Sequence, residues 1–205
     1  MRNWGFGGAL LLAGLALAAT VRAEAQISDD VRAMAQRIRE TTDHGRRPFA
    51  IVDKRAALLV VFHADGRLAG SAAALLGSAY GDATAAGVGE RTQRGALRPG
   101  DATTPAGRFI TQPGQNHTGE AVVWVDPDSA FAIHRLRPGP GHDARARRLD
   151  SAAPGDKRVS AGCVVVAVAF FTRVVLPVLG RRPAVIYVLP EAGLAPARIG
   201  EAQAL

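Results

Sequence analysis

The sequence predicts a mainly β domain with a few short helices. Short segments rich in Val, Leu, Ile and Phe, bounded by Gly, Pro, Asp or Asn, recur between residues 49 and 136, which is typical of strands joined by turns. Helical periodicity is confined to two places, after residue 28 and after residue 167. Of the 205 residues, 48% are apolar but only 5% are aromatic, so aliphatic side chains have to fill the core of one ordinary domain. A single Cys excludes a disulfide scaffold.

Residues 1–25 have the pattern of an export signal. Arg2 precedes an apolar run over residues 5–20, and Ala23-Glu24-Ala25 is a small-x-small cleavage site. The run is shorter than the ~20 residues that a membrane span needs, so we expect cleavage after Ala25, with a retained anchor as the alternative. No Cys directly follows the run, which excludes a lipid anchor. The expected location is the periplasm or the cell wall, without stable membrane insertion after cleavage.

Residues 26–48 are expected to form a helix and a connector. Ser28 is suited to cap the helix, and two Asp residues fall in its first turn, where the helix dipole favours negative charge. Apolar residues follow at helical spacing: Val31, Met34, Ala35 and Ile38. The helix is predicted to end near Thr41, and residues 42–48 to connect it to the main domain.

The main domain is expected over residues 49–191, and it begins with a β-meander. Apolar runs predict strands at residues 49–53, 58–63 and 67–76. Asp65-Gly66 is a typical hairpin turn between the second and third strands.

A long surface loop or a series of short extended pieces is predicted at residues 77–107, which are rich in Gly and small polar side chains. A loop of this length in a compact domain is often functional. Strands are expected again at residues 107–111, 121–126 and 130–136, and the last of them carries His134 near its end.

One more helix and one more strand are expected in the C-terminal part. Apolar residues at residues 167–179 are spaced as on one helix face, and Pro177 and Gly180 are expected to end that helix. Residues 185–189 have the composition of a buried strand, and residues 192–205 form the predicted tail.

The charge of the chain limits its partners. The formal net charge is +7 at pH 7, and removal of the leader, with two Arg and one Glu, leaves +6. A basic exported protein suits the polyanionic cell envelope or a membrane surface. No nucleic-acid partner is expected, because the sequence has no recognition helix, no zinc-finger spacing and no basic strand with interleaved aromatic residues.

The single thiol, Cys163, is an intermolecular bridge, an inert buried residue or a nucleophile. A cysteine nucleophile needs a base within hydrogen-bond reach and N–H groups directed at the oxyanion. Gly162 precedes the cysteine and permits a tight turn, and the strand residue His134 is a candidate base. Spacing alone leaves this pairing open, because the chain has five His residues and a His on a strand is usually structural.

Three strings then resemble, in order, the TPxGxF, IH and R-x-S-x-G-C segments of the L,D-transpeptidase catalytic domain, also called the YkuD domain. They are Thr103–Phe109, Ile133-His134 and Arg158–Val164. The similarity runs from about Phe49 to Glu191, and the S-x-G-C segment is its most specific part.

The resemblance implies a β-sandwich-like domain that acts on peptidoglycan stem tetrapeptides. Cys163 would be the nucleophile and His134 its base, with the Gly162 and Cys163 amides as the oxyanion hole. Arg158 and Ser160 would shape the site or bind stem carboxylates. A thioester acyl-enzyme forms, D-Ala leaves, and transfer to a second stem peptide makes a 3-3 cross-link. The family resemblance implies no metal and no organic cofactor, and stem peptides as the partner. A monomer is one possible form, and the sequence does not decide the oligomeric state.

The chain departs from the family pattern near the site. Ala161 stands where His or an aromatic residue is common, Val165 where Asn or Arg is common, and Arg135 where many relatives have Gly or Ser. The basic segment 137–157 lengthens the spacing between the predicted base and nucleophile. This irregular segment is either a lid whose cations attract acidic substrate groups or a solvated charged loop.

Three other functions remain open at this point. An L,D-carboxypeptidase that trims D-Ala would use the same residues, with water as the acceptor. An envelope-binding module would keep the fold without turnover. A metal-dependent hydrolase would use His63 and Asp65 with further histidines: His117, His134 and His142.

Overall fold

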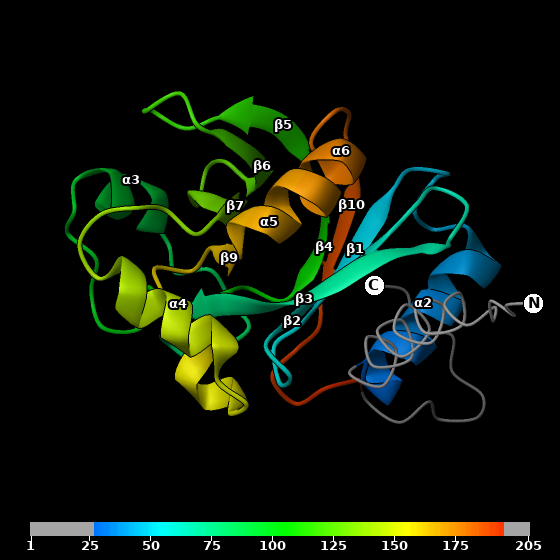
Figure 1. Cartoon of the computed structure of the whole chain (residues 1–205), viewed down its shortest axis with the longest axis horizontal. Coiled ribbons are helices and arrows are strands. Elements are labelled where there is room, and N and C mark those ends of the chain that lie inside the picture. Colours follow the sequence, from blue (N-terminus) through cyan, green and yellow to red (C-terminus); the bar gives the residue numbers. More distant parts are fainter. Residues whose placement is uncertain (1–26, 195–205) are drawn as a thin grey trace, which may run out of the picture.

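The computed structural model describes residues 27–194 and shows a mainly β domain with a few short helices (Figure 1). The predicted export signal at residues 1–25 and most of the predicted tail at 192–205 lie outside the described residues. Within the described part of the chain, no helix is long and apolar enough to cross a membrane.

Ten strands form one large mixed sheet that is nearly barrel-shaped. Along the sheet the order is β4-β10-β1-β2-β3-β9-β7-β6-β5, and β8 pairs with β3 outside this path. The first five strands are β1 (Phe49–Asp53), β2 (Leu58–Phe62), β3 (Leu68–Gly77), β4 (Gly107–Ile110) and β5 (Gln112–Gln115). The others are β6 (Ala121–Asp126), β7 (Phe131–Arg135), β8 (Arg158–Ser160), β9 (Val164–Val166) and β10 (Val185–Val188).

The predicted β-meander is confirmed, because β1, β2 and β3 pair in antiparallel order. Every residue of β1 and β2 is buried, since both faces of this part of the sheet are covered. Alternate residues pack into a central core on one face and against a helix on the other. A strand buried on both faces has an uninterrupted apolar sequence, which explains the continuous run Leu58–Phe62.

The covering helix is α2 (Asp29–Thr41), as predicted. The N–H of Val31 donates to Ser28 Oγ at 3.3 Å, so Ser28 caps the helix. The four apolar residues predicted for its inner face are buried against β1, β2 and β10. Ser28 Oγ also donates to Asp53 Oδ2 at 2.5 Å, which ties the start of the helix to the end of β1.

The predicted loop at residues 77–107 contains one short helix, α3 (Val88–Gln93). Its conformation is fixed by Arg91, whose Nε and Nη2 donate to the two carboxylate oxygens of Asp101, each at 2.7 Å. This bidentate pair is nearly buried, and it holds the pKa of Asp101 at about 2, mainly through the Arg91 hydrogen bonds.

The expectation of an irregular segment at residues 137–157 is wrong, because helix α4 (His142–Asp150) lies within it, followed by the 3-10 turn η1 (Pro154–Lys157). Only one residue of α4, Leu149, is buried, so the helix has no apolar periodicity for a sequence pattern to detect. Leu149 and Ala146 pack on a small cluster that includes Cys163. The segment is therefore folded, and α4 packs beside the cysteine.

The C-terminal helix is confirmed, but Pro177 lies within it. It consists of α5 (Val168–Phe170), the π-helical turn η2 (Phe171–Val175) and α6 (Leu176–Leu179). Pro177 falls in the first turn after the π-helical segment, where its missing N–H removes no needed hydrogen bond. The helix therefore continues to Leu179 and packs over the central core, as Figure 1 shows for α5 and α6.

Candidate active site

The structure places His134 on β7 and Cys163 directly before the adjacent strand β9. Strands β7 and β9 pair in parallel, with His134 opposite Val165 and Ile133 opposite Val164. Ile133 and Val164 both point into the central core. Since successive side chains of a strand alternate in direction, the neighbouring His134 faces away from that core, and Cys163 packs in a separate small cluster. Figure 1 shows β7 and β9 between α3, α4 and α5.

The hydrogen bonding of His134 leaves one ring nitrogen as an acceptor. Nδ1 lies 2.8 Å from the carbonyl oxygen of Arg135, and because a carbonyl only accepts, Nδ1 carries the proton. Nε2 is then the basic nitrogen of the neutral ring. Burial lowers the pKa of His134 to about 4, and the nearby charges of Arg137 and Arg135 act in the same direction. At neutral pH the ring is therefore an uncharged base.

The thiol of Cys163 is also uncharged at neutral pH. Its Sγ donates to the carbonyl oxygen of Ala130 at 3.4 Å. Burial raises the pKa of Cys163, and this effect outweighs the opposing hydrogen bond from the Ala132 N–H and the positive charge of Arg137. Both side chains belong to the described part of the chain, and no hydrogen bond joins them there. At rest Cys163 is therefore a thiol and His134 a neutral imidazole.

We expect His134 to titrate near pH 4, as measured by the chemical shift of its ring carbon. Its folded pKa lies below the ordinary 6.5, so the unfolded state takes up the proton first as the pH falls. The free energy of unfolding therefore decreases between about pH 6.5 and pH 4, by about 2 kcal/mol after allowance for partial solvent screening. The spectrum of His134→Gln identifies the resonance, and a midpoint at 6.5 is incompatible with the described environment.

Ser160 closes the turn that carries the cysteine. Its Oγ donates to the Cys163 carbonyl at 2.6 Å and accepts from the Gly162 N–H at 3.1 Å. The Gly162 N–H is thus already used, so this structure does not support the predicted oxyanion role of that amide. Ser160 is a shaping residue here, which is one of the two roles that the resemblance implies for it.

Gly162 is required by the shape of the turn. Its φ is +124°, and a Cβ at this position would lie 2.8 Å from the Thr103 carbonyl oxygen. The backbone of the cysteine turn therefore packs directly on the Thr103–Phe109 string, which explains why these two motifs occur together.

We predict that Gly162→Ala lowers the free energy of unfolding by about 2 kcal/mol or more, because it adds backbone strain to a steric clash. Urea unfolding measures this change. Gly155→Ala is the matched control: no atom lies within 4 Å of a Cβ there, and the expected change is within about 0.5 kcal/mol. Equal effects in the two variants would show that the close approach at Gly162 is not important.

Thr104 positions the cysteine turn, a role that the sequence did not indicate. Its buried hydroxyl donates to the Gly162 carbonyl at 2.8 Å and accepts from the Gly77 N–H at 2.8 Å. It therefore joins the end of β3 to the cysteine turn. The only signal in the sequence was its place in the Thr-Pro string.

Lys54 is a second residue that the sequence interpretation missed. Its side chain is fully buried, and Nζ donates to Asp82 Oδ1 at 2.5 Å and to the Gly81 and Thr104 carbonyls at 2.7 and 3.0 Å. A buried ammonium is tolerated only with a complete set of partners. Lys54 thereby fixes the loop after β3 against the Thr104 backbone, next to the cysteine turn.

Arg158 is held in place by the same buried charge cluster. Its guanidinium makes a bidentate pair with Glu191 at 2.9 and 2.7 Å and donates to the Lys54 carbonyl at 3.0 Å. It also lies 4.5 Å from the ring centroid of Tyr80. With these contacts and only 6% of its side chain exposed, Arg158 shapes the site, and this structure does not present it to a substrate carboxylate.

The histidines proposed for a metal site are not brought together. Among residues 27–194, no three His, Cys, Asp or Glu side chains are arranged to hold a metal ion. Asp65 instead accepts from the N–H and the side chain of Arg67 in the predicted hairpin turn. The metal-hydrolase interpretation therefore has no site in this part of the structure.

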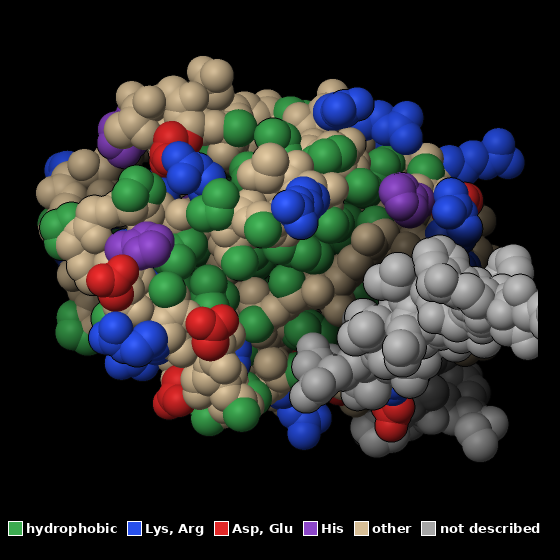
Figure 2. Space-filling model, in the orientation of Figure 1, with side chains coloured by type: hydrophobic (Ala, Val, Ile, Leu, Met, Phe, Trp, Pro, Cys, Tyr) green, Lys and Arg blue, Asp and Glu red, His purple; other side chains and the backbone are tan. Residues whose placement is uncertain are grey.

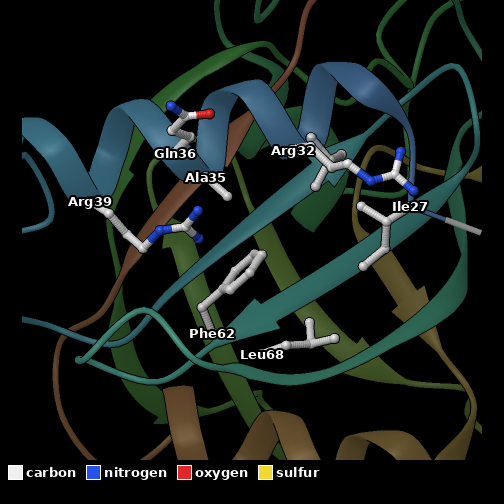
Figure 3. Close-up of a pocket in the computed structure, with 8 residues that line it drawn as sticks. Ile27, Arg32, Ala35, Gln36, Arg39, Phe62 and Leu68 are labelled. Carbon is white, nitrogen blue, oxygen red and sulfur yellow. The ribbon is translucent and has the colours of Figure 1, made fainter. Parts of the chain in front are cut away.

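A cavity of about 520 Å³ lies elsewhere, between α2 and the β2–β3 hairpin (Figure 3). Phe62 and Leu68 form its floor, and one side of α2, with the exposed residues Arg32, Gln36 and Arg39, forms its other wall. None of its lining residues belongs to the predicted site, and its walls have no nucleophile or titratable pair. We therefore assign the chemistry to the cysteine turn and not to this cavity.

Comparison with models of known protein families and with curated proteins finds no match to this chain. The function has to be argued from the site itself.

Proposed function

We propose that the chain is an exported cysteine L,D-transpeptidase with the corresponding β-sandwich fold. The observation that carries this proposal is the position of Cys163 directly before β9, the strand that pairs with the His134 strand, with Nε2 of the ring as the available base. The three strings that resemble the L,D-transpeptidase domain support it. They meet in space, because the Thr103–Phe109 string contacts the cysteine turn.

The proposed reaction begins with the neutral pair. As Sγ attacks the carbonyl carbon of the third stem residue, Nε2 of His134 takes the thiol proton. The resulting imidazolium gives this proton to the nitrogen of the leaving D-Ala, and the C–N bond breaks. A thioester to Cys163 remains. The amine of a second stem peptide then attacks the thioester, His134 accepts its proton, and the thiol is restored as the 3-3 link forms.

In the neutral resting state the ring is free to accept a proton, but its low pKa makes it a weaker base than an ordinary imidazole. An imidazole that is uncharged above about pH 4 is available as a base throughout the physiological range. The positive charge of Arg137 and the Ala132 N–H favour the thiolate as it develops. Proton transfer is thus concerted with attack and does not require a preformed ion pair.

Mass analysis of the products from purified disaccharide-tetrapeptide tests the proposal. A 3-3 linked dimer together with free D-Ala is the expected result. A disaccharide-tripeptide alone would identify an L,D-carboxypeptidase, with water as the acceptor. No turnover by a folded protein would contradict both and favour an envelope-binding module.

A further inference from the structure

An ion cluster formed by Glu120, Arg135 and Arg137 lies at the end of the strand that carries His134. Glu120 directly precedes β6, which pairs with β7. Its Oε1 accepts from Arg135 Nη2, and its Oε2 lies 2.8 Å from Nε of Arg137. The Asn116 amide donates to Glu120 Oε2 at 3.2 Å and helps to hold the carboxylate. Two guanidinium groups share one carboxylate, so the cluster has one excess positive charge.

Within this cluster, Arg137 is the group with free hydrogen-bonding capacity. Its buried Nε lies 2.8 Å from Glu120 Oε2 without making a hydrogen bond, and its two terminal nitrogens make none with the described part of the chain either. Its side chain is 38% exposed, so a solute can reach these nitrogens. A guanidinium with two free N–H groups at its end matches a carboxylate in bidentate geometry.

Arg137 is also close to the reacting groups. It follows Leu136, which packs in the same cluster as Cys163, and its charge acts on both the His134 ring and the Cys163 thiol. The carbonyl of Arg137 accepts from Arg145 Nη2 at 3.3 Å, so α4 supports the backbone at this point. The guanidinium is therefore a positioned cation beside the candidate site.

We propose that Arg137 binds the terminal carboxylate of the donor peptide, and that it makes the enzyme selective for stem peptides that end in a free carboxylate. This inference rests on the proposed function. The leaving nitrogen has to approach His134 to receive a proton, and the α-carboxylate of the leaving residue is separated from that nitrogen by one carbon atom. Arg137 extends from the same strand end as His134, so it lies on the leaving-group side of the scissile bond.

Donor peptides with a terminal carboxylate or a terminal carboxamide test the proposal. Wild-type protein should prefer the carboxylate by about 10- to 100-fold in kcat/KM, the range expected for a hydrogen bond to a charged group. In Arg137→Gln this ratio should fall to near one, and Arg137→Lys, which keeps the charge, should retain part of it. Arg147→Gln, which removes an exposed charge from α4, should keep the wild-type ratio. A ratio unchanged in Arg137→Gln, or lost equally in Arg147→Gln, would overturn the proposal.

Alkylation of Cys163 separates this proposal from the proposed function. Iodoacetate carries a carboxylate and iodoacetamide does not, and neither reagent requires turnover of a stem peptide. The ratio of the two alkylation rates should be several-fold higher in folded wild-type protein than in folded Arg137→Gln. If no stem peptide reacts but this difference is found, the proposed function fails and the carboxylate site remains. If peptides react and neither ratio depends on Arg137, only the carboxylate site is wrong.

Discussion

Cys163→Ala is expected to abolish release of D-Ala from disaccharide-tetrapeptide, with a decrease of at least about 10⁴-fold in kcat. No other side chain in the described site supplies a nucleophile: Ser160 Oγ is held between the Cys163 carbonyl and the Gly162 N–H. The substitution removes one sulfur atom from a partly buried position, so the fold should be retained. Mass analysis of released D-Ala and a urea unfolding curve measure the two effects.

The same variant distinguishes an enzyme from an envelope-binding module. If the chain is an enzyme, Cys163→Ala loses turnover and still binds isolated peptidoglycan. If it is a binding module, wild type and variant bind equally and neither turns over any stem peptide. D-Ala release at the wild-type rate by folded Cys163→Ala would contradict the assignment of the nucleophile.

His134→Ala is expected to reduce the acylation rate by about 10²- to 10⁴-fold, because a general base contributes a factor of this size. The effect should be large here, since the raised pKa of Cys163 leaves little thiolate without a base to take the proton. Stopped-flow or quenched-flow acylation rates measure it.

His117→Ala is the matched control, because His117 is exposed in the turn between β5 and β6 and should be replaceable without loss of rate. If His134→Ala acylates as fast as the wild type, the proposed pair is wrong even if Cys163 is the nucleophile.

Much of the fold could be predicted from local patterns. Residues 49–53 were predicted with their observed bounds because an apolar run ends at a charged residue, and α2 was predicted from its cap and its apolar spacing. Strands β8 and β9 have three residues each. A segment of this length is too short to show the alternation of apolar and polar residues by which a strand is recognised. Pro177 was interpreted as the end of a helix because the π-helical turn that accommodates it has no pattern of its own.

From the sequence, only those candidate site residues that lie within a recognisable motif could be named. Cys163 and His134 were named as nucleophile and base from the resemblance of those strings, because spacing alone left the pairing open, and these roles stay predictions. The partners of the surrounding groups could not be predicted, because they come from distant parts of the chain. Arg158 pairs with Glu191, 33 residues away, and with the carbonyl of Lys54, 104 residues away. A sequence pattern shows a charge, but tertiary contacts decide whether it is free.

The most direct test of the proposed function is the mass of the protein during turnover, with the modified residue located by peptide mapping. We predict an adduct of one disaccharide-tripeptide acyl group on Cys163 in the wild type, removable by hydroxylamine as expected of a thioester. The adduct should be absent from Cys163→Ala and should form far more slowly in His134→Ala. A folded, substrate-treated wild-type protein without an adduct and without product, or an acyl group on another residue, would contradict the proposed function.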